Sequence, residues 1–117
     1  MNNRNFTRVY YSVGASISID GDVLICNTDN LSLRGMYLKI GHEVPLNIPV
    51  SVTVYNSNQT SLKFNGRVVR IEESGVGILI DGLSAVAFAK LRDIVADNSN
   101  NRGEIIQETY KMLQCIY

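Results

Sequence analysis

Apolar residues alternate with polar or small ones over much of the first 80 residues, and this two-residue period limits the fold more than any other feature. The clearest run consists of Val9, Tyr11, Val13, Ala15, Ile17 and Ile19. Such alternation is typical of a strand with one buried face. Asp20-Gly21 follows, a pair that favours a hairpin turn. Residues 23–26 are therefore predicted to return as a second strand.

Four more strands are predicted, over residues 36–40, 48–55, 60–71 and 76–80. The polar residues 27–30 are expected to lie between the second and third strands. Asn65-Gly66, inside the long fifth strand, favours a bend or a bulge. Six short antiparallel strands indicate a mainly β fold closed into a barrel, because closure removes the unpaired strand edges.

The period then changes to that of two helices. Ser84 is a suitable cap for a helix over residues 85–96 with an apolar stripe, and this helix is expected to plug one barrel mouth. The stripe consists of Val86, Ala87, Leu91, Ile94 and Val95. We predict a barrel with its N-terminal arm and capping helix over residues 1–96, and a linker over residues 97–103.

An amphipathic C-terminal helix is predicted within residues 104–117. Asn101 and Glu104 have the spacing of a capping box. One helix face is expected to hold the apolar residues Ile105, Ile106, Tyr110, Leu113 and Tyr117, widened by Met112 and Ile116. This face exposes too much apolar surface to stand alone, so we expect it to pack on the barrel, form a homodimer or contact a partner.

Charge and composition exclude several classes of function. The 117 residues carry eleven Lys and Arg against eleven Asp and Glu, so a polycation that coats nucleic acid or membranes is not expected. No apolar run approaches the roughly 18 residues that span a bilayer, and no signal-peptide core is visible, so a cytoplasmic location is expected. The chain has two cysteines without a CxxC motif and one histidine, His42, so neither a metal site nor an enzyme is predicted.

The first segment with useful chemistry holds Arg4 and Arg8, just before the first strand. No acidic residue occurs in residues 1–19, so these two guanidinium groups make a local positive site on a neutral protein. A guanidinium group binds phosphate through two parallel hydrogen bonds and stacks on purine faces. Two ordinary solvated arginines remain the alternative.

The second segment runs from Asn30 to Gly35. Asn30 offers a donor and an acceptor to a base edge, Ser32 offers a hydroxyl, and Gly35 lets a ligand approach the backbone. Alternation places Asn30, Ser32 and Arg34 on one side. A plain polar loop is the alternative for this segment taken alone.

Together the two segments resemble the motifs of the PilZ domain family, an RxxxR pair followed by (D/N)xSxxG. They are Arg4-x-x-x-Arg8 and Asn30-x-Ser32-x-x-Gly35, and the body over residues 66–78 looks similar too. The resemblance covers roughly residues 4–96. It implies a six-stranded antiparallel barrel that binds the bacterial second messenger cyclic di-GMP and acts in regulation through a downstream protein partner.

The resemblance also implies roles for single residues. Arg4 and Arg8 would clasp phosphates and guanine, Asn30 would read a guanine edge, Ser32 would add a hydrogen bond, and Gly35 would leave room. Candidates for additional contacts are Asn5, Leu31 and Arg34. Many members have Asp at the position of Asn30, and often Gly at that of Arg34. Ligand binding is expected to order the arm and so relay the signal.

Alternatives to this function remain open on the sequence. A degenerate PilZ-like adaptor would act only through protein contacts, and a single-stranded nucleic-acid barrel would want a basic groove, which the net charge opposes. The number of ligands is a further question. An extra arginine often precedes the RxxxR pair in members that accept two stacked ligands, and this chain has Asn3 there. We therefore expect one ligand per chain, although Arg34 is a potential substitute.

Overall fold

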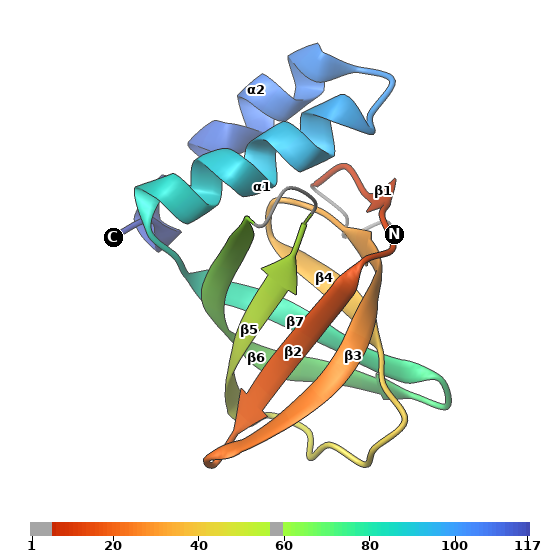
Figure 1. Cartoon of the computed structure of the whole chain (residues 1–117). Helices are drawn as coiled ribbons and strands as arrows, with labels where there is room; N and C mark the ends of the chain where they lie inside the picture. Colours follow the sequence, from red (N-terminus) through yellow and green to blue (C-terminus); the bar gives the residue numbers. More distant parts are fainter. Residues whose placement is uncertain (1–5, 57–59) are drawn as a thin grey trace.

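A closed barrel of six antiparallel strands forms the body of the protein. The computed structural model describes residues 6–56 and 60–117. Its barrel strands are β2 (Gly14–Ile19), β3 (Asp22–Leu31), β4 (Gly35–Lys39), β5 (Pro49–Tyr55), β6 (Ser61–Glu72) and β7 (Gly75–Gly82). The order β3-β2-β5-β6-β7-β4 closes because β4 pairs again with β3 (Figure 1). The predicted barrel is thus confirmed.

The hairpin between β2 and β3 is also as predicted. Asp20 and Gly21 both have positive φ angles, 50° and 89°, which are the signs of the type I′ turn that suits strand twist. The bulge expected near Asn65-Gly66 is present as a shift in the register between β6 and β7. A second shift follows between Val68 and Arg70, so the alternation of inward and outward side chains changes along β6.

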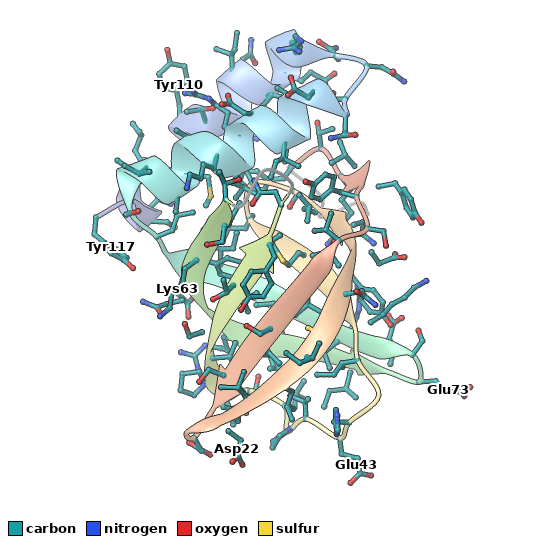
Figure 2. The ribbon with its side chains drawn as sticks, viewed as in Figure 1. Asp22, Glu43, Lys63, Glu73, Tyr110 and Tyr117 are labelled. Atoms are coloured by element: carbon teal, nitrogen blue, oxygen red, sulfur yellow. The ribbon has the colours of Figure 1, made fainter. Side chains whose placement is uncertain are left out.

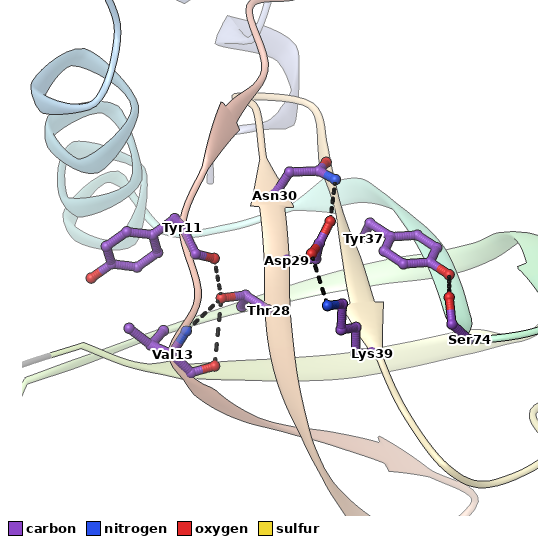
Figure 3. A network of polar contacts seen from close by, with 8 residues as sticks. All are labelled: Tyr11, Val13, Thr28, Asp29, Asn30, Tyr37, Lys39 and Ser74. Carbon is purple, nitrogen blue, oxygen red and sulfur yellow. Dashed lines mark hydrogen bonds and ion pairs between the residues drawn. The ribbon is translucent and has the colours of Figure 1, made fainter.

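The single first strand predicted over residues 9–19 is wrong, because it is interrupted. Its start, β1 (Val9–Tyr10), pairs with the end of β3 outside the barrel, and β2 begins at Gly14. The buried Thr28 hydroxyl fills the gap: it donates to the carbonyl of Tyr11 at 2.5 Å and accepts from the amide of Val13 at 2.9 Å (Figure 3). This side chain adds to two backbone hydrogen bonds across the gap, from the Tyr11 amide to the Asp29 carbonyl at 3.1 Å and from the Thr28 amide to the Val13 carbonyl at 2.8 Å.

The polar residues 27–30 were expected between strands, and this prediction is wrong too. They belong to β3, where Asn30 pairs with Tyr10 on one edge and with Tyr37 on the other. Strand neighbours on both edges satisfy the backbone whatever the side chains are, so polarity alone did not mark a loop here.

Helix α1 (Ala85–Asp97) lies across one end of the barrel, as predicted (Figure 1). The Ser84 hydroxyl accepts a hydrogen bond from the amide of Ala87 at 3.1 Å and so caps the helix. The side chains that join the barrel core are Ala87, Phe88, Leu91, Ile94 and Val95. Phe88 therefore takes the place expected for Val86, which is exposed.

Helix α2 (Arg102–Tyr110) packs against α1, but it is shorter than the predicted helix. Asn101 caps the helix as expected, with its side chain accepting from the Glu104 amide at 3.3 Å. The capping box is incomplete, because the Glu104 carboxylate accepts from the Asn101 side chain at 3.1 Å, whereas the Asn101 backbone amide donates to the Ser99 hydroxyl at 3.0 Å. After Tyr110 the chain turns into the short helix η1 (Leu113–Cys115). Its end runs beside Leu83, with the Leu83 amide donating to the Cys115 carbonyl at 3.0 Å.

The apolar face predicted for this C-terminal segment is wrong in most of its members. The inward face consists of Ile105, Glu108, Met112 and Cys115, whereas the exposed residues are Ile106, Tyr110, Leu113 and Tyr117. The helix ends at Tyr110, so later residues no longer follow a helical period. The segment packs back on the rest of the chain, which was one of the three expected outcomes.

Candidate functional site

The turn between β3 and β4 is held by Ser32. Its buried hydroxyl accepts hydrogen bonds from the amides of Arg34 and Gly35, both at 3.2 Å, and its own amide donates to the Gly35 carbonyl at 2.8 Å. This is the local pattern by which Ser side chains stabilise tight turns. Ser32 therefore shapes the segment, and its hydroxyl is already engaged within the turn.

Gly35 is the first residue of β4 and lies close to the backbone of β7. A Cβ atom at this position would collide with the backbone carbonyl oxygen of Ile78. A positive φ is not the reason for glycine, since among the described glycines only Gly21 has one. The absence of a side chain at Gly35 lets the β4–β7 ladder form beside the turn.

Two of the predicted site residues meet directly. The Arg8 guanidinium donates to the Asn30 side-chain oxygen at 2.6 Å, and the Asn30 amide group donates to Asp29 at 3.0 Å. Asp29 in turn lies 3.4 Å from the Lys39 ammonium (Figure 3). The structure thus joins the segment before β1 to the end of β3 through a polar chain. Arg4 and Asn5 lie outside the described residues.

A cavity of about 190 Å³ opens beside this contact. Its lining combines residues of the N-terminal segment, the β3–β4 turn and strands β4, β6 and β7: Phe6, Arg8, Ser32, Arg34, Gly35, Met36, Val69, Arg70, Gly77, Ile78 and Leu79. Of the other predicted residues, Asn30 does not line the cavity but bonds to Arg8, which does, and Leu31 is fully buried in the barrel core and does not line it either. Three arginine side chains therefore face one small hollow.

Arg70 is a lining residue that sequence reasoning missed. Its guanidinium lies 5.6 Å from the centre of the Tyr37 ring and its Nε lies 2.7 Å from the Glu72 carboxylate. Gly77 makes room for it, since a Cβ there would lie 3.3 Å from the Cβ of Arg70. The shift in register before Arg70 decides which way it points, and simple alternation along β6 gives no sign of that.

Arg34 connects the same cavity to the C-terminal segment. One of its guanidinium nitrogens lies 3.5 Å from the buried sulfur of Cys115 in η1. The predicted resemblance marked Arg34 as a departure from the usual Gly. The structure places this arginine on the cavity wall, where its charge adds to those of Arg8 and Arg70.

Within the described ranges, no group of three or more His, Cys, Asp or Glu side chains is placed to hold a metal ion. None of the helices in that part of the chain has the length and apolar character to cross a membrane.

Comparison with known proteins identifies the family to which this barrel belongs. The family model of the PilZ domain matches residues 2–97. The chain belongs to the PilZ domain family. Its barrel resembles the PilZ domain of YcgR from Escherichia coli, solved with cyclic di-GMP, with a TM-score of 0.71, 13% identity, and 96% of this chain and 100% of that one covered.

Two other solved structures show the same fold. The Bacillus subtilis inhibitor of motility MotI/DgrA aligns with a TM-score of 0.69 and 10% identity over 97% of this PilZ chain and 54% of that one, so this chain spans about half of its length. The PilZ domain of CeSA from a cellulose-synthesizing bacterium aligns with a TM-score of 0.60 and 18% identity over 78% and 96%. A search of curated proteins finds no match.

Proposed function

We propose that this PilZ domain is a receptor for cyclic di-GMP and that the ligand binds at the arginine-lined cavity. The observation that carries the proposal is the convergence of Arg8, Arg34 and Arg70 on one hollow, where the two predicted motif segments meet. Cyclic di-GMP is a dianion with two flat purines. Guanidinium groups bind phosphate oxygens and also stack on purine rings, so they suit both parts of it.

Each predicted residue has a role in this proposal. Arg8 and Arg4 contact phosphate and guanine, and Asn30 offers its amide to a guanine edge. Ser32 stabilises the β3–β4 turn, and Gly35 leaves room for the ligand because it places no side chain on the cavity wall. The cavity is smaller than the roughly 300–1,000 Å³ typical of small-molecule sites. We therefore place one part of the ligand inside and the rest against the open surface, where Arg4 is proposed to cover it.

The proposed activity is regulatory and involves no catalysis. The PilZ domain of Escherichia coli YcgR was solved with cyclic di-GMP, and membership of the same family supports the same ligand here. Phe6, Thr7 and Arg8 already make defined contacts in the structure, and the rest of the arm lies outside the described residues, so ordering of the arm on binding stays a proposal. The signal then passes to a downstream protein partner.

Titration calorimetry with cyclic di-GMP, cyclic GMP-AMP and GTP tests the proposal. We expect saturable binding of cyclic di-GMP and weaker binding of the other two, because only the first offers two guanines around a compact ring of two phosphates. Absence of heat with all three would overturn the proposal and favour the adaptor that acts only through protein contacts.

A further inference from the structure

One carboxylate is buried where the N-terminal segment touches the C-terminal helix. Among the residues that the structure describes, Glu108 of α2 is the only charged residue that is buried, with 7% of its surface exposed. It occupies the inward face together with Ile105 and Met112, a position at which an apolar side chain would cost less desolvation. A buried carboxylate needs hydrogen-bond donors to offset that cost.

The donors come from Thr7, 101 residues away in the chain. The Thr7 amide donates to Oε1 of Glu108 at 2.8 Å, and the Thr7 hydroxyl donates to Oε2 at 2.6 Å. Both carboxylate oxygens are thus engaged by one residue, through its backbone and its side chain. Nearby, the ammonium of Lys111, the residue directly after α2, lies 5.5 Å from the centre of the Phe6 ring, which adds a second contact between the C-terminal region and the same segment.

The residue that bonds to Glu108 lies between two residues of the cavity wall. Phe6 and Arg8 line the cavity, while Thr7 between them bonds to α2. On the far side, Val9 pairs with Leu31 in the β1–β3 ladder. The short segment that carries Arg8 is therefore fixed at both ends, by a helix on one side and by a strand on the other.

We propose that Glu108 is a positioning residue for the ligand: it holds Thr7 so that Arg8 stands at the cavity in the binding geometry. The inference rests on the proposed function. It makes helix α2, which lies outside the matched PilZ region of residues 2–97, a part of the receptor site without touching the ligand. A receptor whose arm is already in place binds more tightly than one that must first select that conformation.

Linkage makes the effect reciprocal. If docking of α2 on the arm, here residues Phe6 to Arg8, raises the affinity for cyclic di-GMP by some factor, the ligand strengthens that docking by the same factor. Bound ligand should therefore slow amide hydrogen exchange in α2, although no ligand atom is proposed to reach it.

The test compares Glu108→Met with Glu108→Gln by calorimetry with cyclic di-GMP. Met fills similar space on the inward face and removes a buried charge, so the fold is expected to persist, and thermal melting checks this. Met accepts no strong hydrogen bond, so the contact with Thr7 is lost. We expect at least about a fivefold loss of affinity for Met, at the lower end of typical coupling between sites. Gln still accepts from the Thr7 amide, so it should retain most of the affinity. Thr7→Val loses the hydroxyl bond and keeps the amide bond, so it should lower affinity by less than Glu108→Met. Adding Thr7→Val to Glu108→Met should cost little more, because both bonds are already lost.

Glu104→Gln is the matched control, because it removes the same charge from the same helix while keeping the capping spacing. It should bind like the wild type. Wild-type affinity in both Glu108→Met and Thr7→Val would overturn the inference, and so would fully additive losses.

Hydrogen exchange without ligand separates this inference from the proposed function. The Thr7 amide should exchange faster in Glu108→Met than in the wild type whether or not any nucleotide binds. Equal exchange rates would show that the Thr7 amide does not bond to Glu108. If the wild type fails to bind cyclic di-GMP while this difference persists, the proposed ligand is wrong and the docking of the arm on α2 stands.

Discussion

Two hollows in the surface of the barrel differ in the charge of their walls, and the larger one has the wrong charge for an anion. The arginine-lined cavity has about 190 Å³. A second hollow, of about 770 Å³, is lined by His42, Glu43, Glu72 and Glu73 among others. The two hollows adjoin at the ion pair between Arg70 and Glu72. Figure 2 shows Asp22, Glu43 and Glu73 on separate turns in the part of the molecule away from the helices. We call this the acidic end.

The difference teaches that charge placement identifies the site better than volume does. A dianionic ligand is repelled by carboxylates and attracted to guanidinium groups, whatever space each hollow offers. The zero net charge of the chain gives no sign of this local difference between the two hollows. The following predictions test the contrast between the two hollows.

Gly35→Ala should have the largest effect. The new Cβ would collide with the Ile78 carbonyl oxygen, so β4 and β7 must separate. We expect a loss of about 2–4 kcal/mol in unfolding free energy by urea denaturation, in the range of severe single substitutions. Gly41→Ala at the acidic end is the matched control, because a Cβ there meets nothing within 4 Å, and it should stay near wild type. Equal stability of the two variants would contradict the close approach at Gly35.

Arg8→Ala and Arg4→Ala should each weaken cyclic di-GMP binding about tenfold or more without unfolding the barrel. Hydrogen bonds to charged groups contribute roughly 1.5–3 kcal/mol each. Calorimetry measures the loss, and the melting temperature without ligand should barely move. Arg92→Ala on the exposed side of α1 and Glu43→Ala at the acidic end are controls that should keep wild-type affinity. Unchanged affinity in both arginine variants would remove these residues from the site.

Titration stoichiometry should be one ligand per chain. Two stacked ligands would bring four phosphate charges, and Asn3 supplies none of the positive charge that an extra arginine would. Arg34→Ala should lower affinity several-fold and leave the ratio at one. A ratio of two in the wild type that falls to one in Arg34→Ala would make Arg34 the substitute for the missing arginine.

Arg70→Ala should reduce affinity by a smaller factor than Arg8→Ala, because Glu72 already neutralises part of its charge. Arg67→Ala is the control from the same strand, since Arg67 pairs loosely with Asp81 at 3.9 Å and does not line the cavity. Calorimetry on both variants decides the matter. A larger loss for Arg67 than for Arg70 would show that general surface charge attracts the ligand.

Changes at Cys26 should leave ligand affinity unaltered, since this buried thiol of β3 lines neither hollow. Burial raises the pKa of the Cys26 thiol from its usual 9.0 to about 11. Alkylation at pH 8 should therefore be about a hundredfold slower than for an exposed cysteine. The unfolding free energy should not depend on this thiol below pH 9 and should fall between pH 9 and 11, where the unfolded chain loses the proton first. Rapid labelling of the folded chain would contradict this.

Much of the barrel was predictable because strands with one buried face show their period in the sequence. The Asp20-Gly21 turn and the Ser84 cap were equally visible, since each depends on neighbouring residues alone. The break at Tyr11–Val13 was not, because it depends on a hydroxyl from Thr28 on another strand. Contacts between distant segments leave no local signal.

The candidate site divides in the same way. Arg8, Asn30, Ser32 and Gly35 were found because their spacing resembles a family pattern. Arg70 and Glu108 escaped notice. Arg70 points to the cavity because a bulge shifts the register, and Glu108 is an acid on a face where the helical pattern predicts apolar residues.

The pairing of Thr7 with Glu108 also has a consequence in time. The last barrel strand ends at Gly82, yet the contacts that hold Arg8 and Arg34 reach forward to Glu108 and Cys115. Proteins are synthesised from the N-terminus, and their earlier parts begin to fold first. A ribosome-bound chain can therefore close its barrel before helix α2 has emerged, and until then Thr7 lacks its partner Glu108. On the proposed function, the geometry that binds the ligand is completed only after the barrel has closed.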